Sequence, residues 1–182
     1  MRYFNFVILT LLLAFASNIH AEINIQLPEI VTNEWPLYEK QGEAKFKKLG
    51  LHIYDASLWK LSKNKSAENP NTVTALSIVY ARNINANRLL SSTHKEWKRL
   101  GFAQQYPIDA WLRSLEEIWP DIQKNDLLVF ISNEDGDNQF YSGTEILGSV
   151  DDPRFASAFL DIWLSENAKY QKHRKELLGE IQ

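Results

Sequence analysis

The sequence of 182 residues contains no cysteine. This absence excludes disulfide frameworks, thiolate zinc sites, iron–sulfur clusters and cysteine nucleophiles. The sequence also lacks an excess of positive charge, because 20 Lys and Arg residues stand against 23 Asp and Glu residues, for a net charge of −3. A mildly acidic chain is a poor candidate for a general nucleic-acid binder, since such proteins usually carry a strong basic excess. We therefore expect no nucleic-acid partner.

Common catalytic and cofactor motifs are missing as well. The seven glycines are scattered and form no phosphate-binding loop, and no G-x-S-x-G nucleophile elbow occurs. None of the four histidines lies at metal-ligand spacing from another histidine. The acidic segment Asn133–Asn138 lacks the alternating ligands and the distal Glu of a calcium loop, so we interpret it as a hairpin turn. The sequence thus predicts neither a metal nor a cofactor.

Aromatic and aliphatic side chains are what the sequence has in abundance. Hydrophobic residues make up 45% of the chain and charged residues 24%, and the aromatic residues comprise six Trp, seven Tyr and nine Phe. This composition is typical of a globular protein, and the length suits one domain. The aromatic content favours a bulky core, an aromatic pocket, or both.

The N-terminal segment has the pattern of a secretory signal peptide. Arg2 precedes the apolar run Phe4–Phe15, and the segment Ala16–Ala21 ends in a small residue. We therefore expect cleavage of residues 1–21 after Ala21, which leaves residues 22–182 as one exported, periplasmic domain. The alternative is an uncleaved anchor, which the twelve-residue run disfavours because a membrane span needs about 20 apolar residues. We expect no transmembrane segment in the mature chain.

Hydrophobic periodicity predicts three strands, two helices, three further strands and a final helix. The predicted strands are Gly42–Leu49, Leu51–Lys60, Val73–Tyr80, Leu127–Ser132, Gln139–Ser142 and Glu145–Val150. The predicted helices are Ala86–Leu100, Pro107–Trp119 and Asp152–Leu164, followed by a charged helical tail over Glu166–Gln182. Gly50 is interpreted as a bulge or bend rather than a full turn. Because strands and helices do not alternate, the order favours an α+β fold, with helices on one face of an antiparallel sheet.

Two charged features leave alternatives open. Alternation along Leu51–Lys60 places Asp55 on the face opposite Tyr54. Asp55 is either a strand-edge residue or a buried polar anchor, and alone it supports no acid–base role. The basic segment Lys169–Lys175 either contacts an anionic surface or forms a solvated helix face, and the solvated face is favoured because exposed charge runs usually have that role.

Three passages together resemble the chalcone-isomerase-like family. The first has a Gly, an aliphatic residue and a Tyr on a strand, the second ends a helix with Trp, basic residues and Leu-Gly, and the third joins a Gly-containing strand to an aromatic helix. They are Leu49–Trp59 (LGLHIYDASLW), Val79–Gly101 (VYARNINANRLLSSTHKEWKRLG) and Ile146–Leu164 (ILGSVDDPRFASAFLDIWL). The likeness covers most of residues 42–165 and is nearest to the exported bacterial branch of the family. It implies an open-faced antiparallel β-sheet packed against a layer of helices, in agreement with the predicted order.

The resemblance does not extend to the catalytic residues of the plant enzymes, which close a flavanone ring with an arginine, a threonine, a tyrosine and an asparagine. With the sequence aligned on Gly50, the threonine position holds Lys47. With the sequence aligned on Trp97, the tyrosine position holds Asn85 and the asparagine position holds Ser92. The early arginine is missing too. Because an enolate-like transition state needs donors fixed where charge develops, the resemblance implies the fold but not the ring-closing activity.

Plant relatives without the catalytic residues bind fatty acids, so the resemblance implies a small apolar or amphipathic ligand such as a fatty acid. An aromatic-rich sheet covered by helices can leave an apolar cleft, and a cation beside it would suit an acidic head group. The candidate ligand-binding residues are Lys47, Tyr54, Tyr80, Arg82, Asn85, Leu89, Ser92 and Trp97. For any one of the aromatic candidates, ordinary core packing is the favoured alternative.

The functional prediction is therefore a non-catalytic periplasmic protein that binds such a ligand. One alternative is an isomerase, of the intramolecular lyase class, with a rewired site. The other is a scaffold that contacts a protein partner through an exposed aromatic patch.

Overall fold

In the computed structural model, the described residues are 38–61 and 73–181. The predicted signal peptide, residues 1–21, lies outside them. The strands are β1 (Tyr38–Lys48), β2 (Leu51–Leu61), β3 (Thr74–Tyr80), β4 (Leu127–Ser132), β5 (Asn138–Ser142) and β6 (Glu145–Gly148). The helices are α2 (Ala86–Arg99), the short 3-10 helix η2 (Phe102–Gln104), α3 (Ile108–Ile118), α4 (Phe155–Leu164) and α5 (Gln171–Leu177).

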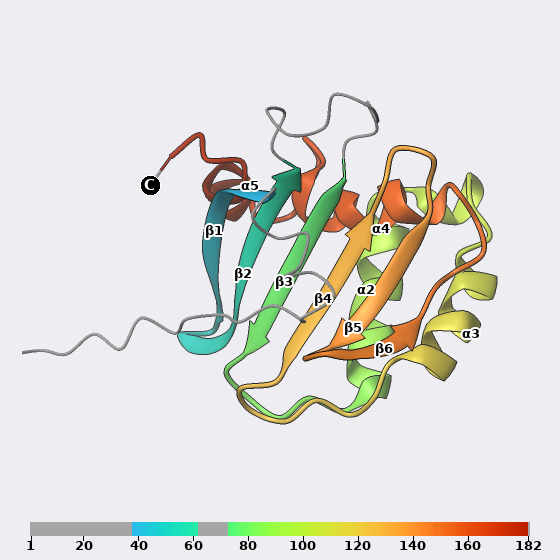
Figure 1. The fold of residues 1–182 in the computed structure, drawn as a ribbon, viewed down its shortest axis with the longest axis horizontal. Helices are drawn as coiled ribbons and strands as arrows, with labels where there is room; N and C mark the ends of the chain where they lie inside the picture. The colour runs from blue at the N-terminus through green and yellow to red at the C-terminus, as the bar shows by residue number, and fades with distance from the viewer. Residues whose placement is uncertain (1–37, 62–72, 182) are drawn as a thin grey trace, which may run out of the picture.

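The described strands form one antiparallel sheet in which every strand pairs with its neighbour in the chain, in the order β1-β2-β3-β4-β5-β6. Helices α2, α3 and α4 lie on one face of this sheet, and α5 lies beside β1 at its edge (Figure 1). The predicted α+β class, an open antiparallel sheet with a helical layer, is confirmed. Among the described residues, none of the helices has the length and apolar character needed to cross a bilayer.

The connection between β1 and β2 differs from the prediction. Lys48 pairs directly with Leu51, so Leu49 and Gly50 form a complete two-residue hairpin turn rather than a bend. Both have positive φ, 51° at Leu49 and 77° at Gly50, as a type I′ turn requires. The prediction was wrong because the usual Asn-Gly or Asp-Gly signal is replaced here by Leu-Gly, and a leucine rarely adopts this backbone conformation.

The inner face of the sheet carries two groups of buried side chains. Under α3 and α4 the core is a dense set of interlocking rings, in which Phe130, Phe140 and Phe159 contact one another at 4.7–5.3 Å between centroids. Under α2 and α5 most of the buried residues are smaller; they include Ala44 and Ala56, and aromatic side chains are fewer than under α3 and α4. The second region is therefore the part of the inner face where space remains between sheet and helices.

The outer face agrees with the predicted alternation of β2. Trp59 packs with Val129 and Tyr141 there, whereas Ala56 belongs to the inner core. Asp55 is on the outer face too, where its carboxylate lies 3.0 Å from Nε2 of His52 and 3.9 Å from the Lys45 ammonium. Asp55 is therefore a partly buried carboxylate on the face of the sheet away from the helical layer.

Helix α5 is fixed to the sheet edge by close backbone contact with β1. A Cβ atom at Gly42 would lie 2.0 Å from the carbonyl oxygen of Glu176, and one at Gly179 would lie 2.4 Å from that of Gln41. Only glycine permits this approach, and Gly179 also has a φ of +71°. The two contacts hold the C-terminal helix against β1, where it forms a wall of a cavity.

Candidate functional site

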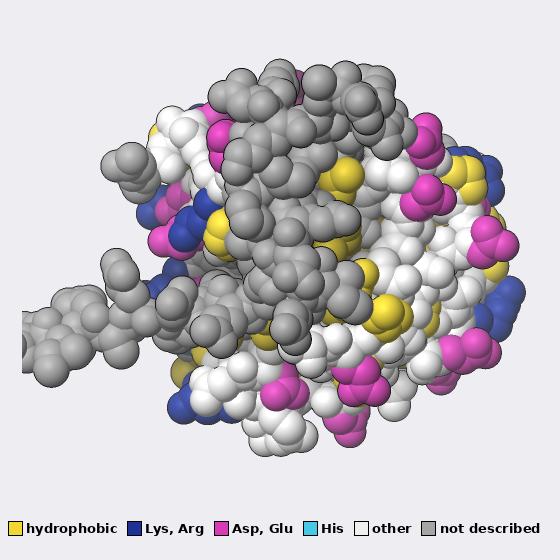
Figure 2. Space-filling model, in the orientation of Figure 1, with side chains coloured by type: hydrophobic (Ala, Val, Ile, Leu, Met, Phe, Trp, Pro, Cys, Tyr) yellow, Lys and Arg dark blue, Asp and Glu magenta, His cyan; other side chains and the backbone are white. Residues whose placement is uncertain are grey.

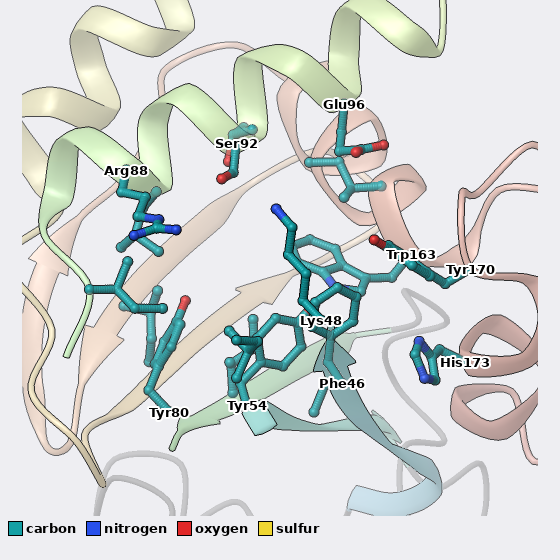
Figure 3. A pocket seen from close by; sticks show the side chains of 18 of the residues that line it. Phe46, Lys48, Tyr54, Tyr80, Arg88, Ser92, Glu96, Trp163, Tyr170 and His173 are labelled. Carbon is teal, nitrogen blue, oxygen red and sulfur yellow. The ribbon is translucent and has the colours of Figure 1, made fainter. Parts of the chain in front are cut away.

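A cavity of about 850 Å³ lies between the inner face of the sheet and helices α2, α4 and α5. Its volume is within the roughly 300–1,000 Å³ typical of small-molecule sites. The floor comes from the sheet, and residues on the helices close the other sides. Figure 3 shows side chains from β1, α2 and the C-terminal segment converging on this space.

Much of the cavity lining is apolar. Small and aliphatic side chains of the sheet belong to the lining: Ala44, Ala56, Ile78 and Leu128. Aromatic side chains line the cavity as well: Phe46, Tyr54, Tyr80, Trp119, Phe159, Trp163 and Tyr170. An apolar chain bound here would be removed from water along most of its length, which stabilises the complex by about 0.8 kcal/mol per buried methylene.

The remaining lining is strongly basic. Its cationic side chains are Lys48, Arg82, Arg88, Lys95, Lys124 and Lys169, and its carboxylate is Glu96. Glu96 is already paired, because it lies 2.6 Å from Arg99 and 3.7 Å from Lys169. Within the described ranges, the other five cations of the lining form no ion pair with a carboxylate. The cavity therefore favours a negatively charged group.

The polar ends of four labelled side chains face the same part of the cavity. Lys48 extends from the end of β1 toward α2, and the hydroxyl of Ser92 points toward it (Figure 3). Arg88, one turn before Ser92, points down from α2 toward the hydroxyl of Tyr80 (Figure 3). Two cations and two hydroxyls at one end of an apolar space make a suitable environment for an acidic head group.

Tyr54 is held by contacts on both sides. Its hydroxyl accepts a hydrogen bond from Nε1 of Trp163 at 3.0 Å, and its ring stacks on Phe46 at 4.8 Å. Burial raises the pKa of the Tyr54 hydroxyl well above its ordinary value. Burial also raises the pKa of Tyr80, and the nearby Tyr54 adds to that effect. Both tyrosines therefore stay neutral and can donate a proton to a hydrogen bond at physiological pH.

We expect these two tyrosines to make the protein less stable as the pH rises above about 10, where an exposed tyrosine ionises. Unfolding exposes both hydroxyls, so the unfolded chain loses protons that the folded chain still holds, and the free energy of unfolding falls with pH. Thermal unfolding followed from about pH 8 to about pH 11.5 measures this fall. The double variant Tyr54→Phe, Tyr80→Phe is the control, and an equally steep fall in that variant would contradict the assignment.

Five of the predicted site residues line the cavity. They are Tyr54, Tyr80, Arg82, Leu89 and Ser92. They come from β2, the end of β3, the loop that follows it, and the cavity-facing side of α2. The structure thus brings together the strand and helix parts of the predicted cleft.

Three predicted site residues do not line the cavity. Lys47 is exposed between Phe46 and Lys48, whose side chains do line it. Asn85 caps α2, where its side-chain oxygen accepts a hydrogen bond from the backbone N–H of Arg88 at 2.9 Å. Trp97 is fully buried on the other side of α2, where its Nε1 donates to the carbonyl of Ala158 at 2.9 Å.

Several lining residues were not predicted from the sequence. They include Phe46, Lys48, Arg88, Trp163, Tyr170 and His173. For β1, the alternation of Ala44, Phe46 and Lys48 was a usable signal, because residues two apart share a face of a strand. For Trp163, Tyr170 and His173 no local signal exists, since their place depends on how the C-terminal segment returns to β1.

Comparisons with known proteins agree with this architecture. The sequence model of a family described as chalcone isomerase-like matches residues 25–179. An uncharacterized protein of Haemophilus influenzae is 26% identical over 138 residues, which cover 76% of this chain and 66% of that protein, slightly under two thirds of its length. A crystal structure of a fatty-acid binding protein of Arabidopsis thaliana superposes with a TM-score of 0.58 at 16% identity, covering 79% of this chain and 88% of the other. At that level of identity the similarity shows a shared fold.

Proposed function

This chain belongs to the chalcone isomerase-like family, and on that premise we propose that it binds a small amphipathic ligand with an acidic head group, such as a fatty acid. The observation that carries the proposal is a cavity of about 850 Å³ with an apolar floor and five lining cations that have no carboxylate partner among the described residues. The name of the Arabidopsis protein of similar fold, a fatty-acid binding protein, supports the same ligand class.

In the proposed complex, the carboxylate lies between Lys48 and Arg88. The hydroxyls of Ser92 and Tyr80 complete the polar end, and the alkyl chain runs over Ile78 toward the aromatic side of the cavity. Charge-assisted hydrogen bonds orient the head group, and burial of methylene groups supplies most of the affinity. A neutral ligand of the same length would keep only the second contribution.

Isothermal titration with hexadecanoate tests this proposal. The wild-type protein is expected to bind, and Ser92→Trp to weaken binding by more than about tenfold, because an indole at this position fills the space under α2. Ser91→Trp is the matched control, since Ser91 is exposed on the same helix and does not line the cavity. No heat of binding to the wild type, or equal losses in the two variants, would contradict the proposal.

A second candidate function is an intramolecular lyase with a rewired site. It is favoured by the guanidinium of Arg88, which reaches the cavity from α2 together with Lys48, Tyr80 and Ser92. Such donors suit a developing enolate or phenolate charge. Incubation of the protein with a chalcone tests this function: ring closure above buffer that is lost in Arg88→Gln supports it, and closure at the buffer rate contradicts it.

A protein scaffold is less well supported. Among the described residues, Tyr170 is the single aromatic side chain among the exposed large apolar residues. The described residues therefore do not form the exposed aromatic patch that a scaffold would need.

We further propose that the protein acts in the periplasm. The proposal rests on the sequence pattern of residues 1–21, in which a short apolar run follows a basic residue and ends at small residues. N-terminal sequencing of the protein from a periplasmic extract is expected to begin at Glu22. A chain that begins at Met1, or that stays in the cytosolic fraction, would contradict export.

A further inference from the structure

The tip of the β1–β2 hairpin presents aliphatic side chains to solvent. Leu49 is 95% exposed and Leu51 is 51% exposed; Leu49 is the first residue of the two-residue turn, and Leu51 directly follows the turn. In Figure 2, hydrophobic and basic side chains lie together at the lower left, where Figure 1 places this turn. Single exposed apolar residues are common on protein surfaces, but two at the end of a projecting hairpin form a small apolar wedge.

Leu49 occupies its position against the local backbone preference. Its φ of 51° lies in the left-handed region, which Gly and Asn adopt at lower free energy. Almost nothing packs on its side chain, so the fold gains little from a leucine there. A residue that is strained and unpacked points to a role outside folding.

The surroundings of the tip are basic. Lys45, Lys47 and Lys48 precede the turn, and no acidic residue occurs from Ala44 to Tyr54. Arg82 lies beside the tip, because its Nε donates to the carbonyl oxygen of His52 at 3.1 Å. Asp55, the carboxylate beyond Tyr54, is 3.9 Å from the Lys45 ammonium and 3.0 Å from His52, so it compensates part of this charge only.

Exposed aliphatic side chains surrounded by cationic side chains are suited to binding an anionic bilayer. Aliphatic side chains enter the boundary between head groups and acyl chains, and the flexible lysines reach the lipid phosphates. A protein partner fits less well, because a stable protein interface needs on the order of 1,000 Å² of buried surface, more than two leucines supply. We propose that the β1–β2 hairpin tip docks into bilayers that contain anionic phospholipid, with Leu49 and Leu51 below the head groups and Lys47 and Arg82 among the phosphates.

Docking in this way would set the cavity beside the lipid. Leu51, Lys48 and Arg82 belong to both the tip region and the cavity lining. An amphipathic ligand would then pass between bilayer and cavity over a short path at the protein surface. Docking itself needs no ligand in the cavity, so it can fail while the proposed ligand binding holds, and the reverse is also true.

Co-sedimentation of residues 22–182, the chain expected after signal-peptide cleavage, with lipid vesicles tests the proposal. We expect the wild type to bind vesicles of phosphatidylcholine with phosphatidylglycerol, to bind pure phosphatidylcholine vesicles much more weakly, and to be released by added salt. Leu49→Asn is expected to lower the partition coefficient about tenfold through the loss of apolar burial. Lys47→Gln, which changes a cation outside the cavity lining, is expected to lower it about fivefold.

Matched controls separate the tip from general effects of charge and hydrophobicity. Ile146→Asn removes another half-exposed aliphatic side chain, from β6, and Lys98→Gln removes an exposed cation of α2. Both are expected to bind vesicles like the wild type. Leu49→Asn is also expected to raise the thermal midpoint, because Asn tolerates the left-handed backbone, and this result would show that weaker binding is not a folding defect.

Three results would overturn the proposal. The first is equal binding of the wild type to vesicles with and without phosphatidylglycerol. The second is a loss in Ile146→Asn or Lys98→Gln as large as the loss in the tip variants. The third is a concentration-dependent dimer that Leu49→Asn abolishes without any vesicle binding by the wild type, which would assign the tip to a second copy of this chain.

Discussion

Replacing Lys48 and Arg88 together by glutamate is expected to weaken the binding of a long-chain fatty acid about a hundredfold. The two side chains point into the cavity from β1 and α2 and have no carboxylate partner in the described part of the chain. The double reversal removes two charge-assisted contacts and sets two carboxylates against an acidic head group. Isothermal titration with hexadecanoate measures the change.

The control for this experiment makes the same change in net charge at positions outside the cavity. Lys98→Glu with Lys175→Glu reverses two exposed lysines that do not line the cavity. This variant is expected to bind like the wild type. Equal weakening in the two double variants would show that long-range charge, rather than a head-group site, governs affinity. Hexadecan-1-ol, which has no charge, is expected to bind the wild type and the Lys48, Arg88 variant with similar affinity.

Substitution of Trp97 by alanine is expected to destabilise the protein by about 3–5 kcal/mol, as for other large aromatic side chains lost from a core. The indole is fully buried, its Nε1 donates to the carbonyl of Ala158, and its ring contacts Trp111 and Phe155. The change leaves a cavity and an acceptor without its donor. Chemical denaturation, with the midpoint and slope compared between variants, gives the free energy.

Ser92→Ala, a little over one turn earlier on the same helix, is the control for Trp97→Ala. Ser92 is exposed toward the cavity, so its substitution is expected to change stability by less than about 0.5 kcal/mol. A Trp97→Ala variant with normal stability and weakened ligand binding would contradict the structural role assigned to the indole.

The fold was predictable because each strand and helix is indicated by the pattern of residues within its own segment. The side chains of β2 alternate between the two faces of the sheet from Tyr54 to Trp59, α4 is rich in apolar residues, and the non-alternating order of strands and helices selects an antiparallel sheet with one helical layer. The β1–β2 turn was the exception. Its conformation is set by the pairing of Lys48 with Leu51, and nothing about Leu49 taken alone indicates a left-handed backbone.

The site was predictable only in part, because a cavity depends on which side of each element faces it. Tyr54 and Tyr80 follow from strand alternation, but Lys47 was chosen where its neighbour Lys48 faces the cavity. The apolar residues of α2 contact both the aromatic core and the cavity: Trp97 faces the core, and Leu89 faces the cavity. An asparagine immediately before a helix is an N-cap signal, and Asn85 could have been assigned to that role instead of the site.

The wall formed by the C-terminal segment was beyond sequence reasoning for a different reason. Tyr170 and His173 lie in a segment whose charge pattern is that of a solvated helix. Their rings nevertheless contact Phe46 of β1, at 4.7 Å and 5.5 Å between centroids. This contact depends on the backbone approach at Gly42 and Gly179, a long-range event that no local pattern encodes.

The strictly sequential order of the sheet has a consequence for how the chain assembles. Each described strand hydrogen-bonds to the strand made just before it, so a polypeptide that emerges N-terminus first, from a ribosome or a translocation channel, always has the preceding partner at hand. The sheet can grow strand by strand without waiting for a distant segment. The exception is α5, which must return to β1, so closure of the cavity is the last step of vectorial assembly.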